Sequence, residues 1–160
     1  MTRTEFISHV KGTQGALRRF LHALCCGDSQ LADDVAQETY LKAYITCESF
    51  RENEKFAAWI HRIAYHTFLN LKRGERLTTD VETARSMAAD ASADESFRYQ
   101  DLYQALGQLS EKERTAVLLH YIEGYSVREI ADVTGLSADA VKQHLSRGRR
   151  HLHELLHDKP

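Results

Sequence analysis

Two helix-start signals and a turn glycine lie close together between Ser126 and Ser137. Ser126 is followed three residues later by Glu129, a spacing at which each side chain accepts a hydrogen bond from the other's backbone N–H group. Gly135 supplies the backbone freedom that a sharp turn needs, and Ser137 can cap the helix that follows. This stretch therefore predicts two helices joined by a tight turn, the first over residues 127–134.

The second predicted helix begins at Ala138 and has two faces of different chemistry. Its apolar side recurs at three- and four-residue steps and should face the first helix; it comprises Val141, Leu145, Gly148 and Leu152. The opposite side carries Asp139, Lys142, Gln143, Ser146, Arg147 and Arg150. Such side chains reach base edges and phosphates together, which predicts a helix-turn-helix that reads the major groove of DNA. A solvated surface is the alternative, because most basic helix faces bind no nucleic acid.

The composition favours helices along the whole chain. The 160 residues allow one medium domain or two small ones, and the single proline is Pro160. Because glycine is scarce and no proline lies inside the chain, long helices meet little interruption, and we predict an all-α fold. The formal charge of -2 argues against a general nucleic-acid binder and for charge that is segregated by region.

The three cysteines, Cys25, Cys26 and Cys47, show no metal-ligand spacing and leave an odd number for pairing. We expect small, buried, reduced thiols, with a redox switch as the less favoured alternative. Residues 1–11 show no signal-peptide pattern, and no apolar run is long enough to span a bilayer. The sequence thus predicts a cytoplasmic protein with no membrane insertion, no metal and no cofactor.

Two helices are predicted before residue 50. Apolar residues of the first helix stand on both sides of Gly12 and Gly15, which predicts a weak or kinked point there. Ser29 is predicted to cap the second helix, which should end near Thr46. The core-facing stripe of this second helix is predicted to comprise Leu31, Val35, Leu41 and Ile45.

The second helix carries a compact acidic and amide patch near its start, made of Asp33, Asp34, Gln37 and Glu38. Negative charge is favoured at that end by the helix dipole, which explains the patch without any partner. The functional interpretation is a docking surface for a basic partner protein, and composition alone does not choose between the two.

A third helix, predicted to begin near Phe56, interleaves cations with aromatic rings. Its polar side carries Arg62, His66, Asn70 and Arg73, and the aromatic residues Trp59, Tyr65 and Phe68 lie among them. Aromatic faces between cations suit single-stranded nucleic acid. Core packing explains Trp59 and Phe68 equally well, and for these rings it is the favoured interpretation.

Between residues 77 and 96 the periodic apolar pattern is lost, and small and acidic residues dominate. A flexible acidic tether is the simplest account. We therefore predict two small helical domains, residues 1–76 and 97–160, of which the second contains the helix-turn-helix. In that second domain Ser110 and Glu113 form another capping pair ahead of an apolar helix.

Four segments carry a family resemblance. They are DDVAQET at residues 33–39, FAAWIHRIA at 56–64, LSEKER at 109–114, and residues 125–150. In order and spacing they resemble the extracytoplasmic-function sigma factors, with that family's region 2 in the first domain and region 4 in the second. Four segments in register are a much more specific signal than a lone helix-turn-helix.

The resemblance implies a bacterial transcription initiation factor that binds core RNA polymerase and directs it to promoter DNA. Asp34, Gln37 and Glu38 would meet the coiled coil of the largest polymerase subunit. The recognition helix would read the minus thirty-five element through Lys142, Gln143, Ser146, Arg147 and Arg150. The melted minus ten strand would contact Asn53, Lys55, Trp59, Arg62, His66 and Arg73, with Asn53 in a pocket for an unstacked base. The tether would occupy the polymerase channel, and an anti-sigma factor is a further partner that the resemblance raises.

Some positions depart from the family pattern. Tyr65 and His66 stand where a small or basic residue followed by asparagine is usual, which weakens the strand contacts assigned there. Ser110 replaces the usual proline but can still cap a helix. His144 and Gly148 stand where arginine and alanine are common, and Gly148 should cost its helix about 1 kcal/mol relative to alanine. These departures affect the expected promoter sequence and leave the expected mechanism intact.

Two other classes of function compete with the sigma-factor prediction. A two-domain helix-turn-helix transcriptional regulator that does not bind core polymerase would share the second domain, but its receiver domain needs strands where the sequence predicts helices. An enzyme would need a nucleophile–base pair, a metal spacing or a glycine-rich phosphate loop, and the sequence shows none of them. We therefore predict no catalytic activity.

Overall fold

The computed structural model describes residues 1–51, 54–77 and 99–157, without the side chains of residues 75–77. Within these ranges the chain forms seven α-helices and one short 3-10 helix and contains no strand, so the predicted all-α fold is confirmed. The elements are α1 (Arg3–Leu24), α2 (Ser29–Ile45), η1 (Cys47–Ser49), α3 (Phe56–Leu77), α5 (Gln100–Gln108), α6 (Glu111–Tyr121), α7 (Val127–Thr134) and α8 (Ala138–His157). None of the described helices is both long enough and apolar enough to cross a bilayer.

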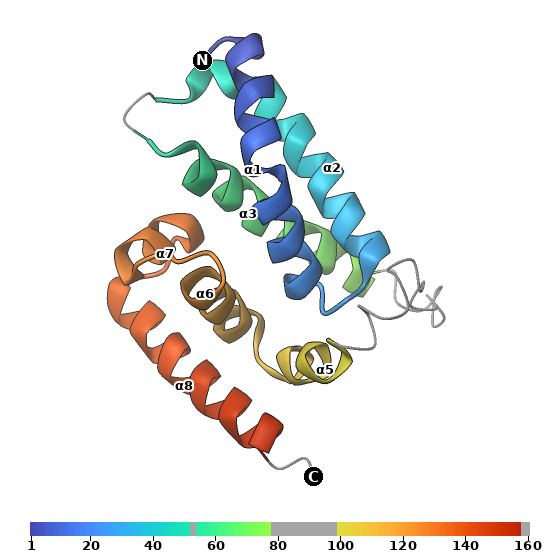
Figure 1. Cartoon of the computed structure of the whole chain (residues 1–160), viewed down its shortest axis with the longest axis vertical. Coiled ribbons are helices and arrows are strands. Elements are labelled where there is room, and N and C mark those ends of the chain that lie inside the picture. Colours follow the sequence, from blue (N-terminus) through green and yellow to red (C-terminus); the bar gives the residue numbers. More distant parts are fainter. Residues whose placement is uncertain (52–53, 78–98, 158–160) are drawn as a thin grey trace.

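In the front half, residues 1–77, α1 and α2 run antiparallel and α3 crosses them (Figure 1). Helix α1 runs unbroken through Gly12 and Gly15, where the sequence predicts a weak or kinked point. Ser29 is also not the cap of α2. Asp28 takes that place, and its Oδ1 accepts a hydrogen bond of 3.1 Å from the backbone N–H of Leu31.

The back half, residues 99–157, begins its helices where the capping pairs predict. Ser110 Oγ accepts from the backbone N–H of Glu113 at 3.1 Å, and Glu113 Oε1 accepts from the N–H of Ser110 at 3.3 Å. The pair at Ser126 and Glu129 makes the same two bonds, at 3.2 and 3.1 Å. Gly135 ends α7 with a left-handed φ of 77°, so the predicted turn is confirmed.

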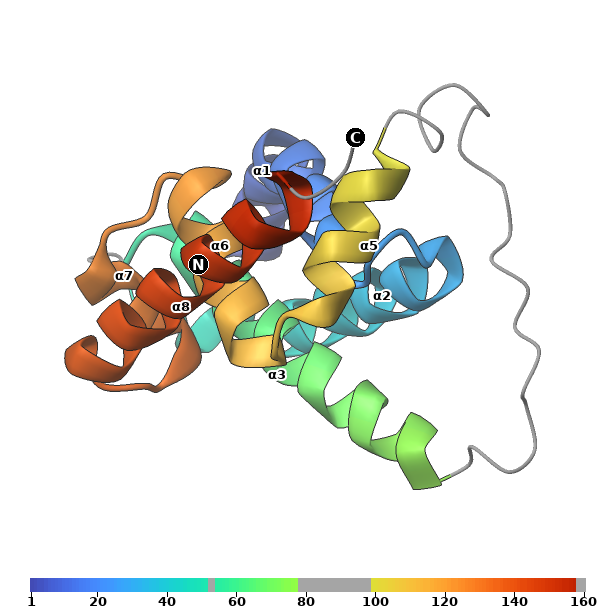
Figure 2. The ribbon, with the colours of Figure 1, turned by 90° about the horizontal axis from the view of Figure 1, so that it is seen from below.

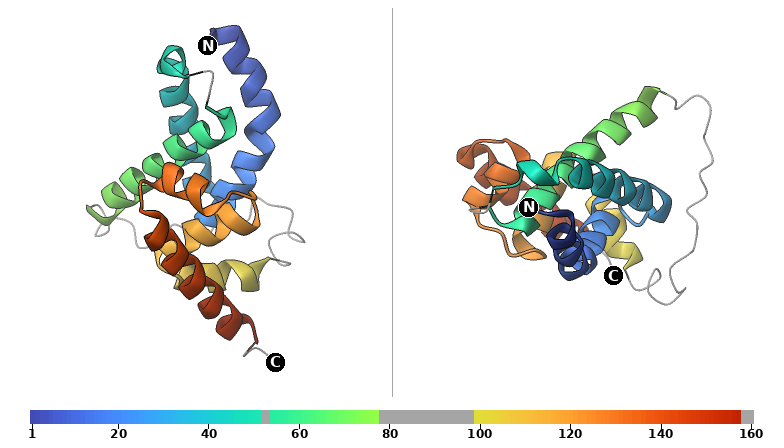
Figure 3. Two further views of the ribbon diagram at one scale, coloured as in Figure 1. Left: turned by 90° about the vertical axis from the view of Figure 1, so that its left-hand side faces the viewer. Right: turned by 90° about the horizontal axis from the view of Figure 1, so that it is seen from above.

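The buried apolar side chains of both halves form one continuous core, in which the largest fully buried residues include Phe20, Phe68, Leu106, Leu119 and Ile130. Helix α6 lies at the centre and contacts α1 on one side and α8 on the other, while α7 lies against α3 (Figures 1 and 3). The two halves are therefore docked on each other. Apart from Leu77, the last residue of α3, the predicted tether at residues 77–96 lies outside the described residues.

Gly148 is required where α8 crosses α6. A Cβ atom at this position would lie 2.8 Å from Val117 Cγ2 and 3.3 Å from the backbone oxygen of Glu113. The helix loses propensity at this glycine but gains a close approach to its neighbour. In contrast, a Cβ atom at Gly12 would meet nothing within 4 Å.

These two glycines give a matched pair of alanine substitutions. Gly12→Ala should raise the free energy of unfolding by about 0.5–1 kcal/mol, because only helix propensity changes. Gly148→Ala should lower it by about 1 kcal/mol, because overpacking against Val117 outweighs the same propensity gain. Chemical denaturation of the two variants measures both effects, and equal gains would contradict the close approach of α8 to α6.

Candidate nucleic-acid and polymerase interfaces

The predicted DNA-reading face of α8 is open to solvent. Its five predicted contact residues, Lys142, Gln143, Ser146, Arg147 and Arg150, are all exposed. The opposite side of the helix places Val141 and Leu145 in the core. Ser137 Oγ accepts a hydrogen bond of 3.1 Å from the N–H of Ala140 and so caps the start of α8, as predicted. The arrangement has the geometry that a major-groove reader needs.

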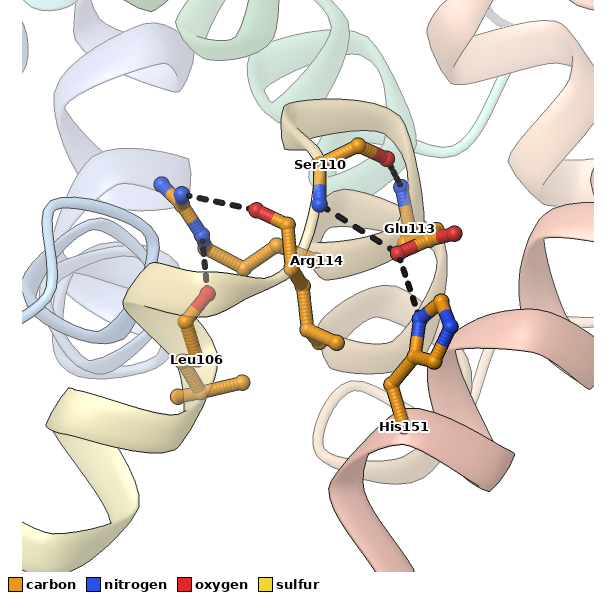
Figure 4. A network of polar contacts seen from close by, with 6 residues as sticks. Leu106, Ser110, Glu113, Arg114 and His151 are labelled. Carbon is orange, nitrogen blue, oxygen red and sulfur yellow. Dashed lines mark hydrogen bonds and ion pairs between the residues drawn. The ribbon is translucent and has the colours of Figure 1, made fainter. Parts of the chain in front are cut away.

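Helix α8 is held from behind by polar contacts to α6 (Figure 4). His151 Nδ1 lies 3.2 Å from Glu113 Oε1, the same oxygen that accepts from the N–H of Ser110. On the flank of the helix, Arg149 Nη1 donates to the hydroxyl of Tyr121 at 3.0 Å. These contacts help to fix the rotation of α8 so that its predicted DNA-binding face points outward.

The acidic patch of α2 is also exposed, and it continues into two aliphatic side chains that the sequence analysis placed in the core. Asp33, Asp34 and Gln37 are exposed and Glu38 is half-buried. Leu41 is 54% exposed and Ile45 is 67% exposed, so the core assignment of these two residues is wrong. Leu41 lies six residues after the buried Val35, about 240° further around the helix, and cannot share its face. The residues that share the buried face with Val35 are Leu31, Ala32, Thr39 and Ala43.

The predicted strand-binding residues of α3 and the segment before it fall into two groups. Lys55, Trp59 and Arg62 line a hollow of about 480 Å³ at the start of α3, which Glu54, Ala58, Glu129, Asp132 and Val133 complete. His66 and Arg73 are exposed further along the helix, whose C-terminal part projects away from the other helices (Figures 2 and 3). Asn53 lies outside the described residues.

Trp59 is mostly buried, with 7% of its surface exposed. Its ring meets Phe50 at 5.3 Å and Phe56 at 5.7 Å between centroids. The structure therefore supports the favoured core interpretation for most of this ring. The cations beside it are accessible: Lys55 has 78% of its side chain exposed and Arg62 has 37%.

The junction between the halves contains a buried polar cluster that the sequence analysis missed. His61 Nδ1 lies 2.7 Å from the carbonyl oxygen of Ala57 and 3.2 Å from the hydroxyl of Tyr125, while Nε2 lies 3.8 Å from Glu123 Oε2. Burial lowers the pKa of His61, raises the pKa of Glu123, and raises the pKa of Tyr125 to about 12. His61 and Glu123, which would form an ion pair if both were charged, thus both favour their neutral forms. His61 Nε2 and Glu123 Oε1 have no hydrogen-bond partner in the described structure.

Arg114 is a second buried residue of the junction that sequence patterns did not reveal. Its Nη1 donates to the carbonyl oxygen of Leu24 in α1 at 2.8 Å. Its Nε donates to the carbonyl oxygen of Leu106 in α5 at 2.9 Å (Figure 4). Its Nη2 lies 3.4 Å from the carbonyl oxygen of Leu109. One guanidinium thus serves carbonyl groups near the ends of two helices from different halves. Its place in the LSEKER segment was the only signal in the sequence.

A groove of about 800 Å³ crosses the junction between α1, α5, α6 and α8. Its apolar lining includes Tyr121 and Ile122, which are 50% and 56% exposed. Arg18, Arg19 and Arg149 also line the groove, and none of the described residues that line it is acidic. The groove therefore offers an apolar floor with cations beside it.

The described structure contains all three cysteines. All three are free thiols; Cys25 and Cys47 are buried and Cys26 is half-buried. Burial raises the pKa of Cys25 to about 12. Among the described residues, His, Cys, Asp and Glu side chains form no cluster of three or more that could hold a metal ion.

Comparison with known proteins matches one family model to each half of the chain. The family model for sigma-70 region 2 matches residues 9–78, and that for sigma-70 region 4 matches residues 99–152. The ECF RNA polymerase sigma factor SigW of Bacillus subtilis is 30% identical over 86% of this chain and 83% of its own length. The RNA polymerase sigma-H factor of Pseudomonas aeruginosa is 32% identical over 89% of this chain and 79% of its own length.

Two solved structures have a similar arrangement of helices. The sigma factor RpoE of Bartonella quintana, in complex with the anti-sigma factor NepR, has a TM-score of 0.78 at 28% identity and covers 98% of this chain and 99% of its own. CnrH, in complex with the cytosolic domain of CnrY, has a TM-score of 0.77 at 25% identity and covers 99% and 92%.

Conservative substitution tests the role of Arg114. Arg114→Lys should lower the free energy of unfolding by about 2–4 kcal/mol, because a single ammonium cannot replace the fork that serves three carbonyl groups. Arg149→Lys is the matched control, since Arg149 is exposed and should change stability by less than about 0.5 kcal/mol. Denaturation curves of both variants measure these changes. Equal losses of unfolding free energy in the two variants would contradict the stabilising role of the Arg114 contacts.

Proposed function

The chain belongs to the extracytoplasmic-function sigma factors of the sigma-70 family, and from that premise we propose which of its surfaces binds core polymerase and which binds each promoter element. As a sigma factor it binds core RNA polymerase and directs promoter recognition. The observation that supports these assignments is that an acidic face of α2 and a basic face of α8 are exposed on different halves of one chain. We assign residues 1–76 to region 2, 77–96 to the linker and 97–160 to region 4.

We assign the minus thirty-five element to α8. Lys142, Gln143, Ser146, Arg147 and Arg150 are exposed together on a capped helix whose far side is buried, so the helix can enter a major groove without unpacking. Lysine and arginine reach phosphates or guanine, and the glutamine amide can read adenine.

We assign core polymerase to the outer face of α2, with Asp34, Gln37 and Glu38 as its polar contacts. Leu41 and Ile45 extend this surface, because they are exposed and lie on the same side of the helix as Asp34 and Glu38. Exposed aliphatic side chains beside a charged patch are typical of a protein–protein interface. The helix dipole explains why acidic residues are favoured near the start of α2, but it does not explain why Leu41 and Ile45 are exposed.

The minus ten strand is assigned to α3 and the segment before it. Lys55, Arg62, His66 and Arg73 supply cations, and Trp59 supplies the edge of a ring in the hollow. Asn53, outside the described residues, keeps its predicted role as a pocket residue for the unstacked base. In this division the chain works as a specificity factor in the cytoplasm and performs no catalysis of its own.

An anti-sigma factor is the proposed regulator. The similar structure of RpoE was obtained with the anti-sigma factor NepR, and that of CnrH with the cytosolic domain of CnrY. The groove between α1, α5, α6 and α8 suits an amphipathic helix with acidic side chains, because its floor is apolar and three arginines line it.

Promoter-specific transcription by core polymerase with this chain is the central test of the proposed function. The purified chain should give discrete transcripts from a genomic template where core polymerase alone gives none, and sequencing their starts identifies the promoters. A product pattern no different from that of core polymerase alone would contradict the proposal.

On a promoter found in this way, Lys142→Ala and Arg147→Ala should weaken holoenzyme binding to the upstream duplex. A residue that reads a base should lose about 1–3 kcal/mol of discrimination at one position, whereas a phosphate contact should weaken binding to all sequences and reduce the salt slope by about 1. Lys11→Ala removes one exposed charge from α1 and serves as the control. A loss as large in Lys11→Ala would contradict the assignment of α8.

Core polymerase affinity tests the α2 surface. Asp34→Asn with Glu38→Gln should weaken the complex by about tenfold or more at low salt, and Leu41→Ser should weaken it by about threefold to tenfold. Glu48→Gln and Leu156→Ser are matched controls, since both residues are exposed and lie outside α2. Measuring complex formation with labelled chain gives the affinities, and loss only in the charge variants would limit the interface to the acidic patch.

A further inference from the structure

The last turns of α8 carry two histidines at a spacing that binds metal ions in other proteins. His153 and His157 stand four residues apart in the sequence HELLH at residues 153–157, a spacing that the sequence analysis overlooked. Two histidines four residues apart on a helix share one face and can hold a zinc ion together. Because so short a motif also occurs by chance, it needs support from the geometry of the side chains.

The structure brings the two imidazole rings together. The ring centroids of His153 and His157 lie 4.1 Å apart, and the ring planes are tilted by 51°. With Zn–N bonds of about 2.0–2.1 Å and near-tetrahedral angles, two imidazole centroids on one ion stand about 5 Å apart. A small rotation of the two side chains therefore gives the distance that a shared ion requires.

Both rings are also available to a ligand. His153 and His157 are exposed, at the end of α8 that lies at the periphery of the molecule (Figure 1). Neither ring makes a hydrogen bond or an ion pair with another of the described residues. Metal binding at this place would thus displace only water.

The charges around the pair act in both directions. The partial negative charge at the C-terminus of a helix favours a cation, and Glu154 adds an exposed carboxylate on the same turn. Arg149 and Arg150 lie one turn earlier and oppose a cation. Arg149 is directed away from the pair, since its Nη1 donates to the hydroxyl of Tyr121 at 3.0 Å. The opposing charge that remains is the exposed guanidinium of Arg150.

We propose that His153 and His157 form a binding site for a divalent transition-metal ion, in which one nitrogen of each ring coordinates the ion and water fills the other positions. Imidazole nitrogens suit zinc, copper and nickel, whereas magnesium and calcium prefer oxygen ligands. A hydrolytic zinc site has three protein ligands, and the described residues form no such group. The proposed site therefore binds a metal ion without catalysis.

This site goes beyond the proposed function and does not depend on it. His153 follows Arg150 by three residues and His157 follows by seven, so the pair continues the side of α8 that we assign to duplex DNA. Because zinc binding is measured without DNA or polymerase, failure of that assignment would leave the metal site standing. Failure of the metal site would likewise leave the assignment of α8 unchanged.

The test is calorimetric titration of the full, reduced chain with zinc chloride, joined to NMR spectra of the histidine ring nitrogens. His153→Ala and His157→Ala each remove one ligand from an exposed helical position, where alanine favours the helix. Glu154→His with His157→Ala keeps two histidines but places them about 100° apart on the helix, where they cannot share an ion. Glu154→Gln controls for the lost carboxylate, and His66→Ala removes an exposed histidine of α3.

We expect the unmodified chain to bind one zinc ion, with the ring signals of His153 and His157 shifting together. Each single alanine variant and the respaced variant should bind zinc about tenfold or more weakly, because the second ligand no longer acts within the same chelate. Glu154→Gln and His66→Ala should stay within about threefold of the unmodified chain, because each keeps both imidazoles of the chelate. Magnesium chloride should produce no binding signal at the pair.

Three results would overturn the site. The first is an unmodified chain that binds no zinc up to about 1 mM, where the free energy of binding would be only about 4 kcal/mol. The second is equal zinc binding in all variants, which would place the ion at other ligands such as the cysteine thiols. The third is a loss in only one of the two alanine variants, because a shared ion needs both rings.

Discussion

A guanidinium buried between helix ends sets how the two halves of this chain meet. Arg114 bonds to the last residue of α1 and to carbonyl groups at the end of α5, so one side chain of region 4 holds both its own neighbour and region 2. It is 7% exposed and its three bonds go to neutral oxygens. A buried charge without such bonds would be costly, and the carbonyl groups at helix ends need donors in turn. Each group therefore depends on the other being in place.

The local parts of the fold were readable from the sequence because their causes are local. The capping pairs at Ser110 and Ser126, the turn at Gly135 and the start of α8 each depend on residues within one turn of a helix. The predicted faces of α8 and α2 have the same origin, since periodicity fixes which side chains point together. The prediction that placed Leu41 in the core was wrong because a six-residue step from Val35 turns the helix by about 240°.

What the sequence did not reveal depends on contacts between distant segments. Gly148 looks like a defect in a helix until Val117 of α6 is placed against it. His61, Glu123 and Arg114 look like ordinary polar residues until the halves dock, which buries them at one junction. The same docking decides which predicted site residues are accessible: α8 and the outer face of α2 are open, whereas Lys55 and Arg62 share a hollow with two acids of α7. Periodicity cannot show this, because it describes one helix at a time.

The three assigned surfaces differ in what borders them in the docked chain. The face of α2 assigned to core polymerase and the face of α8 assigned to duplex DNA are both exposed. The surface assigned to the minus ten strand is bordered by α7, because Glu129 and Asp132 line the same hollow as Lys55 and Arg62. Docking of the halves thus leaves two of the assigned surfaces open and places carboxylates of the back half beside the cations of the third.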